Sequence, residues 1–440
     1  MNESHDTHLE CWVRSAHAAA TDFPIQNLPF GIFRRAESDD EPRAGVAIGD
    51  QILDVTTWLG EGLFDGMAAE AAARCALPTL NALMAMGNEA MSALRRGIVA
   101  ILRSDGIGYE NFKRLGDACL TPISGAQLFL PVQIGDYTDF YASIYHATNV
   151  GSMFRPDSPL LPNYKFVPIG YHGRASSIVV SGYEIDRPRG QTKAADSESP
   201  VFGASRMLDY ESELGVFVGR GNALGAPIPI ERAAEHIFGY CLVNDWSARD
   251  IQAWEYQPLG PFLAKSFATS ISPWVITAEA IEPFRAPAFA RPAQDPAPLA
   301  YLHAPSDQER GGIELFLEVW LRSREMREQN IPPSRLSRST FGSMYWTPAQ
   351  LLAHHSSNGC NLRPGDLLGS GTVSGARKTE RGCLLELTWK GSEPLMLPTG
   401  ERRRFLEDGD EVIMRGYCER DGYVRIGFGD CRGVVLPSAG

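Results

Sequence analysis

The segment LDYESELGVFVG, from Leu208 to Gly219, alternates apolar residues with polar or small ones. This period of two predicts a β-strand over residues 208–217. Because side chains two positions apart on a strand point to the same face, the carboxylates of Glu211 and Glu213 are expected to lie side by side. Two like charges in an apolar strand are costly unless they are paired, protonated or bound to a cation. The segment therefore predicts a divalent cation held on a β-sheet.

Two further acidic residues lie in apolar and aromatic surroundings, Asp139 in DYTDFY and Asp245 in NDWSARD. They are far from Glu211 and Glu213 in the sequence, so only the fold could bring the four carboxylates together. An all-oxygen ligand set suits Mg²⁺, Ca²⁺ or Mn²⁺ better than zinc. From residue types alone an alternative stays open, in which Glu211 and Glu213 form salt bridges on a solvated strand face.

Histidines are the candidates for a general base, because an imidazole titrates near neutral pH. His146 follows Asp139 by seven residues, in DFYASIYHATNVGSMFR, which favours a place beside the cation site. The rival candidates on the same grounds are His172, His354 and His355. For each of them the alternative is a hydrogen-bonded structural role.

Glu386 interrupts the apolar segment LLELTW, residues 384–389, which we predict to be a largely buried strand. A buried glutamate needs a partner, and a catalytic histidine that it orients is one such partner. The alternative is a surface glutamate on an edge strand.

Three hydrogen-bond donors lie among aromatic residues in NDWSARDIQ and GPFLAKS, namely Arg249, Gln252 and Lys265. Donors of this kind can form a pocket for an oxyanion. Arg249 could instead pair with Asp245 or Asp250. The loop SGTVSG, residues 370–375, lacks the GK[ST] ending of a phosphate-binding loop, so no nucleotide site is predicted there.

The overall composition excludes several classes of partner. The formal net charge is −12 and no long basic run is present, which argues against nucleic acid. The eight cysteines are dispersed without a CxxC pair or Cys/His metal spacing, as is typical of reduced thiols in a cytoplasmic protein. The polar start MNESHDTHLE is unlike a signal peptide, and no apolar run is long enough to span a bilayer. We therefore expect a cytoplasmic protein with no membrane partner.

Two regions differ in texture along the chain. Residues 1–128 combine short strands around a charged turn, in residues 30–53, with Ala/Leu/Met-rich helices in residues 68–102, and predict a small β domain with helices. Residues 129–440 contain short β-branched runs punctuated by Gly and Pro, which predict a sheet-rich barrel or roll. Helices are expected there at residues 230–238, 247–256 and 347–356, the last capped by Thr347.

A series of long motifs, in order, resembles the fumarylacetoacetate hydrolase family. The similarity runs from about Asp22 to Leu436 and is carried by DFPIQNLPFG, DYTDFY, HATNVGSMFR, YHGRASSIVVSG, NDWSARDIQ, WEYQPLGPFLAKSF, SMYW, NGCNLRPGDLLGSGTVSG, DGDEVI and GFG. The segments 322–339 and 376–382 (ARKTERG) diverge, and the second lies close enough to Glu386 to alter access to it. The resemblance implies a mainly β, α+β fold, with a small SH3-like N-terminal barrel in residues 1–128 and a larger mixed β-roll in residues 129–440, assembled as a homodimer.

The resemblance also implies roles for individual residues. The family's metal ligands match Asp139, Glu211, Glu213 and Asp245, and a second, structural magnesium contact involves Lys265 and Thr269. The base matches His146, paired with Glu386, and the oxyanion donors match Arg249, Gln252 and Lys265. The substrate contacts match Tyr141, Arg155, Tyr171, Gln252, Tyr256 and Thr372.

The implied activity is metal-dependent hydrolysis of the carbon–carbon bond of a 1,3-diketo acid. The expected substrate is 4-fumarylacetoacetate, giving fumarate and acetoacetate, the last step of tyrosine and phenylalanine catabolism through homogentisate. The expected cofactor is Mg²⁺, Ca²⁺ or both, with Mn²⁺ as a further option. The alternatives are another diketo-acid enzyme of the same superfamily, such as an acylpyruvase or a decarboxylase, and a non-enzymatic calcium-binding protein.

Overall fold

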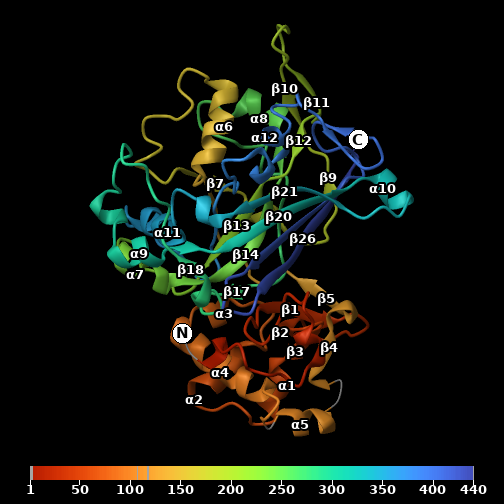
Figure 1. The fold of residues 1–440 in the computed structure, drawn as a ribbon, viewed down its shortest axis with the longest axis vertical. Coiled ribbons are helices and arrows are strands. Elements are labelled where there is room, and N and C mark those ends of the chain that lie inside the picture. Colours follow the sequence, from red (N-terminus) through yellow and green to blue (C-terminus); the bar gives the residue numbers. More distant parts are fainter. Residues whose placement is uncertain (1–2, 107, 116–117, 440) are drawn as a thin grey trace.

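The computed structural model describes residues 3–106, 108–115 and 118–439. The chain forms a small N-terminal part that packs end-on against a larger C-terminal part (Figure 1). Both parts mix sheets with helices, and the larger part contains two extended sheets. The α+β fold class expected from the sequence, with a smaller N-terminal and a larger C-terminal unit, is therefore confirmed.

The N-terminal part is built on a five-stranded sheet with the order β4-β3-β2-β1-β5. Its strands are β1 (Phe30–Arg35), β2 (Arg43–Ile48), β3 (Gln51–Asp54), β4 (Leu120–Pro122) and β5 (Ala126–Phe129). Its helices are α1 (Val55–Gly60), α2 (Gly66–Arg74), α3 (Asn81–Met84), α4 (Asn88–Leu102) and α5 (Gly108–Leu115). The short strands around a charged turn and the helices predicted at residues 68–102 are thus observed.

The C-terminal part contains a central sheet that carries most of the candidate site. Its order is β7-β6-β22-β13-β14-β16-β8, with β17 paired to β14. The strands are β6 (Tyr137–Phe140), β7 (Gly170–Gly173), β8 (Ile178–Val180), β13 (Ser212–Val218), β14 (Ile237–Asp245), β16 (Thr269–Ile271), β17 (Ile276–Thr277) and β22 (Leu367–Gly369). The predicted boundary between residues 128 and 129 stays a prediction; β5 ends at Phe129 and β6 begins at Tyr137.

A second sheet packs on one face of the central sheet, with the order β21-β20-β25-β26-β9. Its strands are β9 (Ile185–Asp186), β20 (Leu315–Arg322), β21 (Ser334–Thr340), β25 (Glu411–Cys418) and β26 (Ile426–Leu436). Four strand pairs complete the β-structure: β10 (Arg189–Thr192) with β11 (Val201–Ala204), β12 (Leu208–Asp209) with β15 (Ser247–Ala248), β18 (Arg285–Ala286) with β19 (Gly312–Ile313), and β23 (Leu395–Met396) with β24 (Arg402–Arg403).

The helices of the C-terminal part are short. They are α6 (Ile144–Phe154), α7 (Ile230–Ala233), α8 (Arg249–Glu255), α9 (Pro305–Arg310), α10 (Arg324–Glu328), α11 (Pro348–Ser356) and α12 (Leu384–Leu387). Helices α6, α8 and α12 gather at the end of the molecule that is remote from the N-terminal part (Figure 1). Among the described residues, no helix combines the length and apolar character needed to cross a membrane.

The two faces of the central sheet are buried against different partners. On β13, Leu214 and Val216 pack into the core shared with the second sheet, whereas Phe217 packs into the core of the N-terminal part. This is the alternation expected for a strand with both faces buried. A bridge between Phe30 and Val275, with both backbone N–H groups donating across it at 3.0 and 2.7 Å, joins the two parts directly.

The structure corrects several predicted elements. The strand predicted at residues 208–217 is broken at Tyr210 and Glu211, so that β12 pairs with β15 and β13 pairs with β14. The helix predicted at residues 247–256 begins only at Arg249. The helix predicted at residues 230–238 ends at Ala233, followed by a 3₁₀ turn, because residue 237 starts β14.

The strand predicted at residues 384–389 is wrong, because Leu384–Leu387 form helix α12. The cause is a long-range contact: Asp209 accepts hydrogen bonds from the backbone N–H groups of Leu384 and Leu385, at 2.8 and 3.0 Å. A carboxylate at this position satisfies the free N–H groups of a helix start and complements the helix dipole. The helix predicted at residues 347–356 is observed, and Thr347 caps it in a capping box with Gln350.

Candidate active site

Four buried carboxylates meet where strands β6, β13 and β14 of the central sheet end. Ligand atoms from Asp139, Glu211, Glu213 and Asp245 all lie within 4.8 Å of one another. Three of these residues are on strands, and their positions in the alternation place them on the face of Tyr137, Phe217 and Val243. Glu211 lies in the break before β13, where its backbone C=O accepts from the N–H of Asp245. The carboxylates predicted from one strand therefore converge even though that strand is interrupted.

Two glycines leave room for the carboxylates. A Cβ atom on Gly369 would lie 2.7 Å from Asp139 Oδ1 and 2.9 Å from Glu213 Oε2. Gly371 has a φ of +76°, and a Cβ atom there would lie 2.2 Å from the C=O of Phe140. Its backbone N–H donates to both Asp139 and Glu213, at 3.2 Å each. The segment LGSGTVSG is thus shaped to hold these carboxylates, not a phosphate.

The cationic residues of the site pair with only part of the cluster. Lys265 Nζ donates to Glu211 and to Asp245, each at 2.6 Å. Arg249 Nη1 lies 2.6 Å from Glu211 Oε1. Neutral donors add to Asp245, which accepts from Thr269 at 2.9 Å and from Tyr171 at 3.0 Å.

Among the described residues, neither Asp139 nor Glu213 has a cationic hydrogen-bond partner. Glu213 Oε1 is buried and has no hydrogen-bond partner among the described residues. Burial, and after it the repulsion by neighbouring carboxylates such as Asp245, raises the pKa of both groups well above the usual range. By contrast, Lys265 and Arg249 outweigh burial and lower the pKa of Glu211.

A divalent cation fits this arrangement. Four converging carboxylate groups, one with an unpartnered oxygen, form an oxygen-only donor set of the kind that Mg²⁺, Ca²⁺ and Mn²⁺ prefer. Lys265 and Arg249 do not neutralise the whole cluster, and a bound cation would supply the missing positive charge. The solvated face of the salt-bridge alternative is wrong, because Glu211 and Glu213 are both buried, although Glu211 does form salt bridges with Arg249 and Lys265.

A buried His146–Glu386 pair lies close to the cluster. Nδ1 of His146 is 2.6 Å from Oε2 of Glu386. The charge of His146 attracts Glu386 and, with hydrogen bonds from its neighbours, outweighs burial and lowers the pKa of Glu386 to about 2. Because an ionised carboxylate only accepts hydrogen bonds, Nδ1 carries a proton, and in the neutral imidazole the lone pair is therefore on Nε2. No described residue donates to Nε2, so this atom is available to accept a proton.

The position of His146 is fixed by its place in the first turn of α6. Ser143 is the N-cap residue of this helix, and its hydroxyl accepts from the N–H of His146 at 3.2 Å. The same hydroxyl donates to the C=O of Ser374 at 3.1 Å. Ser143 thus ties the start of the helix to the loop beside Glu386.

We predict that Ser143→Ala lowers the free energy of unfolding by about 1 kcal/mol, the typical cost of losing an N-cap. The imidazole keeps its Glu386 partner, so kcat should change little although the free energy of unfolding falls. Urea denaturation and steady-state kinetics on the same preparation measure the two effects. The control is Ser143→Thr, which keeps the capping hydroxyl. A stability loss equal in both variants would argue that the cap contributes nothing.

Asp209 connects the two halves of the site. Besides accepting from the start of α12, it accepts from Arg249 Nε at 2.9 Å. Arg249 Nη1 also donates to Gln252 Oε1 at 3.2 Å, while Nη2 is buried without a partner among the described residues. One buried carboxylate therefore positions both the helix of Glu386 and the guanidinium of Arg249.

The predicted substrate contacts fall into two groups, those whose side chains contact other residues of the site and those that make no such contact among the described residues. Tyr141 packs edge-on against the ring of His146, with centroids 5.3 Å apart, and Tyr171 bonds to Asp245. Thr372 Oγ1 is buried without a partner among the described residues. Arg155 follows the last turn of α6, and its side chain bonds weakly to the C=O of Pro159 at 3.4 Å. Tyr256 follows α8 and makes no side-chain hydrogen bond to the other candidates.

Comparison with known proteins decides the family. Residues 26–131 match the family described as Fumarylacetoacetase N-terminal, and residues 137–436 match Fumarylacetoacetate (FAA) hydrolase C-terminal. The chain is 50% identical over 423 residues to the fumarylacetoacetases of Bos taurus and Homo sapiens, covering 96% of this chain and 98% of each of them. It is 51% identical over 422 residues to the fumarylacetoacetase of Caenorhabditis elegans, covering 95% and 97%. The chain belongs to the fumarylacetoacetate hydrolase family.

Membership of the fumarylacetoacetate hydrolase family makes the chain an enzyme, a hydrolase that acts on a small molecule. The dependence of this family on a divalent metal agrees with the buried carboxylate cluster. Among solved structures, the fumarylacetoacetate hydrolase of Exiguobacterium antarcticum is 17% identical, with a TM-score of 0.50 and coverage of 93% of this chain and 99% of that one. That similarity supports the fold alone.

The rival histidines lie elsewhere. His355 bonds to Thr138 at 2.8 Å and packs edge-on against His172, with ring centroids 6.3 Å apart. His354 lies 3.0 Å from the hydroxyl of Tyr301. Among the described residues none of the three contacts a carboxylate of the cluster, and the hydrogen bonds of His354 and His355 agree with the structural alternative.

Several residues of the site were not predicted from the sequence. Asn149 Nδ2 donates to Glu386 Oε1 at 2.7 Å, and Ser374 Oγ donates to Oε2 at 2.8 Å. Cys383 Sγ lies 3.2 Å from the same Oε2. Asn149 is three residues after His146, so a helical reading of HATN would have placed both on one face. Asp209 carried no such local signal, since its partners are remote in sequence.

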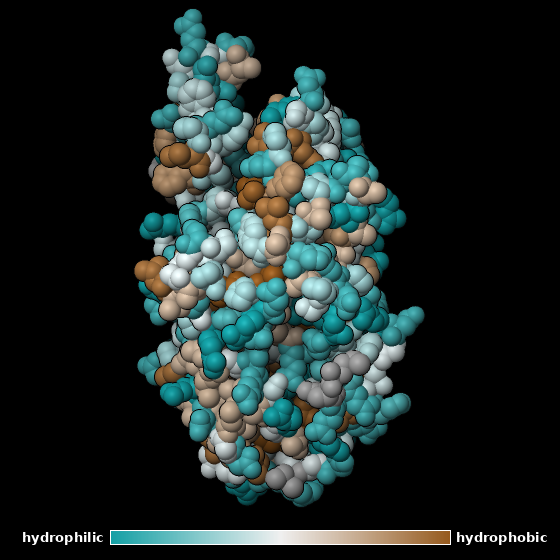
Figure 2. Space-filling model, turned by 90° about the vertical axis from the view of Figure 1, so that its left-hand side faces the viewer, coloured by the Kyte–Doolittle hydropathy of each residue, from teal (hydrophilic) through white to brown (hydrophobic). Residues whose placement is uncertain are grey.

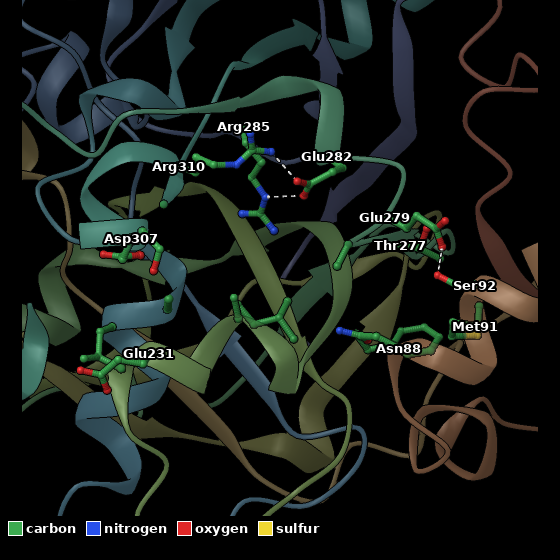
Figure 3. A pocket seen from close by; sticks show the side chains of 18 of the residues that line it. Asn88, Met91, Ser92, Glu231, Thr277, Glu279, Glu282, Arg285, Asp307 and Arg310 are labelled. Atoms are coloured by element: carbon green, nitrogen blue, oxygen red, sulfur yellow. Dashed lines mark hydrogen bonds and ion pairs between the residues drawn. The ribbon is translucent and has the colours of Figure 1, made fainter. Parts of the chain in front are cut away.

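A separate pocket lies between the N-terminal and C-terminal parts, away from the cluster (Figure 3). Its walls include Ser92 of α4, which bonds to Glu279 at 2.7 Å, and Arg310, which pairs with Glu282. Glu279, Glu282 and Asp307 are paired or hydrogen-bonded there, and none of the candidate site residues lines the pocket. It takes no part in the chemistry considered for the family.

Proposed function

We propose that this hydrolase cleaves 4-fumarylacetoacetate to fumarate and acetoacetate, the last step of tyrosine and phenylalanine catabolism. The observation that carries the proposal is the buried His146–Glu386 pair beside the carboxylate cluster. It occurs in a chain that is half identical, over nearly its whole length, to proteins named fumarylacetoacetase. A structural calcium site alone would need no such base.

In this proposal His146 activates water. Its free Nε2 accepts a proton from water as the water oxygen attacks a carbonyl carbon of the diketone. Collapse of the tetrahedral oxyanion breaks the carbon–carbon bond, and the leaving enolate takes up the proton held on the imidazolium. Glu386 accepts from Nδ1–H and stabilises the imidazolium that forms. Asn149 and Ser374 hold Glu386 as a carboxylate, which keeps the imidazole in the tautomer that can act as a base.

The oxyanion formed by this attack needs donors that the protein does not already use. Arg249 has the buried, unpartnered Nη2 group. Gln252 accepts from Arg249 through its oxygen, which orients the amide and leaves its NH₂ group free to donate. Lys265 donates two of its three N–H groups to Glu211 and Asp245 and retains one. We assign these groups to the oxyanion.

Asp139, Glu211, Glu213 and Asp245 would hold the cation, which we propose to be Mg²⁺ or Ca²⁺, with Mn²⁺ as a further option. When bound, the ion supplies a Lewis acid that stabilises negative charge on the diketone oxygens and on the leaving enolate. Lys265 and Thr269, which bond to Asp245, position that ligand, in keeping with their proposed contact to a second ion.

The substrate is anionic, and its recognition is assigned to groups around His146. Arg155 Nε is buried without a partner among the described residues. We propose that Arg155 and Tyr141 bind a terminal carboxylate. Tyr171, Tyr256 and the unpartnered hydroxyl of Thr372 are proposed to contact the remaining oxygens.

We expect Arg155→Met to raise KM for fumarylacetoacetate by tenfold or more, since a hydrogen bond to a charged group is worth about 1.5–3 kcal/mol. KM for a diketone without the terminal carboxylate should change little. The comparison is made by steady-state kinetics on both substrates, with Arg155→Lys as the variant that keeps the charge. Equal effects of Arg155→Met on both substrates would make Arg155 structural.

We further propose a homodimer located in the cytoplasm. Large apolar side chains are exposed along the projecting β10–β11 hairpin and beside α8, with 66% of Phe202, 68% of Phe262 and 95% of Leu259 accessible. Figure 2 shows apolar residues, in brown, below the tip of this projection. Exposed apolar patches of this kind mark association surfaces. The eight cysteines, dispersed without a CxxC pair, agree with a reducing compartment. Light scattering of the eluting protein measures the assembly.

The activity is tested by following the loss of diketone absorbance on fumarylacetoacetate, with and without a chelator. The proposal expects hydrolysis that stops with the chelator and returns with Mg²⁺ or Ca²⁺. Acylpyruvates and a decarboxylation assay are run in parallel. Turnover of those compounds, with no loss of fumarylacetoacetate, would assign the chain to another diketo-acid activity of the family.

A further inference from the structure

We propose that the chain has a second, non-catalytic site that binds small anions carrying two negative charges. It is a pocket of about 570 Å³ lined by residues 206–207, 390–391, 402 and 404–407, here called the basic pocket. Four cationic side chains line it, those of Arg206, Lys390, Arg402 and Arg404. None of them belongs to the proposed catalytic machinery, and the inference does not depend on the proposed function.

The cations of the basic pocket are not neutralised by the protein. Within the described ranges, the side chains of Arg206, Arg402 and Arg404 make no hydrogen bond or ion pair, and Lys390 contacts only the ring of Phe154, 4.3 Å from its centroid. The one acidic residue in the lining, Glu407, lies 3.3 Å from Arg403, which is directed away to other carboxylates.

The lack of neutralising acidic groups around these cations contrasts with the rest of the chain. The chain as a whole carries a formal charge of −12, and Arg403, between Arg402 and Arg404 in sequence, is paired with Glu401, Glu407 and Asp410. Of these three consecutive arginines, Arg402 and Arg403 form β24 and Arg404 follows it, and only Arg403 is neutralised. Cations that converge on a concave surface create a local positive potential that attracts anions.

The backbone of the basic pocket is held by hydrogen bonds at each of its segments. The N–H of Leu406 donates to the C=O of Leu208 at 2.8 Å, and the N–H of Arg206 donates to Asp250 at 2.8 Å. Thr388 Oγ1 bonds to the C=O of Arg404 at 3.0 Å. Gly391 has a φ of +82° and lies close to Phe405. The rim is therefore built on fixed backbone, although its side chains are long.

The lining chemistry defines the class of ligand. Met207, Phe405 and Leu406 supply apolar surface between the cationic groups. Guanidinium groups bind carboxylate and phosphate oxygens in pairs of parallel hydrogen bonds, and several of them together select an anion with more than one charge. A dicarboxylate and inorganic phosphate share this chemistry. Acetate, with one charge, should bind much more weakly.

The test is isothermal titration calorimetry of the full-length, metal-loaded protein with inorganic phosphate, succinate and acetate. The double variant Arg402→Gln/Arg404→Gln is compared with Arg96→Gln, which removes an exposed arginine of α4 that has no partner among the described residues. We expect the double variant to lose at least tenfold in affinity for phosphate, succinate or both, and Arg96→Gln to lose little. Loss for phosphate alone identifies a phosphate-type ligand, and loss for succinate alone identifies a dicarboxylate.

A second measurement locates the binding. Acetylation of Lys390 by limiting acetic anhydride, followed by peptide mass spectrometry, should be slowed by the anion that binds in the wild type and unchanged in the double variant. Thermal unfolding confirms that each variant is folded. The proposal is overturned if the wild type binds neither dianion, if Arg96→Gln loses as much affinity as the double variant, or if bound anion leaves Lys390 unprotected.

Discussion

His146→Asn is expected to lower kcat by about 10²–10⁴-fold, the range that general-base assistance contributes. Asparagine retains hydrogen-bonding capacity near Glu386 but cannot accept a proton from water at neutral pH. The cation ligands are not altered, so metal content should stay at the wild-type level. Rapid-quench or steady-state kinetics on the diketo acid, together with elemental analysis, measure both quantities.

Glu386→Gln should lower kcat in the same direction, because the imidazolium loses its counter-charge. The double variant should be hardly slower than His146→Asn, since residues that act as one unit are not additive. His172→Asn serves as the matched control and should leave kcat nearly unchanged. If His146→Asn turned over at a normal rate, the assignment of the base would fail; if the two losses multiplied, Glu386 would act independently of His146.

Glu213→Gln is expected to weaken cation binding by at least about 10–100-fold, the loss typical even of groups that only support a metal ligand. This residue is a cleaner choice than Glu211, whose carboxylate also binds Arg249 and Lys265. Activity at limiting Mg²⁺ or Ca²⁺ should fall in parallel and partly recover at high metal. Equilibrium dialysis and kinetics against metal concentration measure the change.

The same variant should also alter stability. A cation at a hundred times its Kd stabilises the folded protein by about 2.7 kcal/mol, so chelation should lower the Tm of the wild type but not that of Glu213→Gln. Without metal the variant should be about as stable as the wild type, because burial and the neighbouring carboxylates raise the pKa of Glu213 well above its usual range and so already favour its uncharged form. Glu231→Gln, an exposed substitution on α7, is the control. If chelator left the Tm of the wild type unchanged, that result would contradict the binding of a cation to the cluster.

The sequence predicted the site better than it predicted the local structure around it. The convergence of Asp139, Glu211, Glu213 and Asp245 could be inferred because a buried carboxylate in an apolar stretch needs compensation wherever the chain places it. The strand break at Tyr210–Glu211 could not, because alternation continues through it; only the pairing of β12 with β15 reveals it. The roles of Arg155, Tyr256 and Thr372 stay predictions.

Helix α12 shows why some elements escape sequence reasoning. The segment LLELTW suits either a buried strand or a buried helical turn, and such short apolar runs are ambiguous by periodicity. What decides is Asp209, 175 residues earlier, which binds the first N–H groups of the helix. The donors to Glu386 from Ser374 and Cys383 are unpredictable for the same reason, since they depend on how two loops meet.

The attachment of the N-terminal part to the central sheet has a consequence for inherited or engineered variation. Phe217, Val243, Ile271 and Leu367 of the central sheet are buried in one core with side chains of the N-terminal part. A destabilising substitution in that core would expose an apolar sheet face during or after synthesis, which favours aggregation and degradation. Its phenotype would be a lower cellular amount of enzyme, while each surviving molecule keeps the turnover number of the wild type.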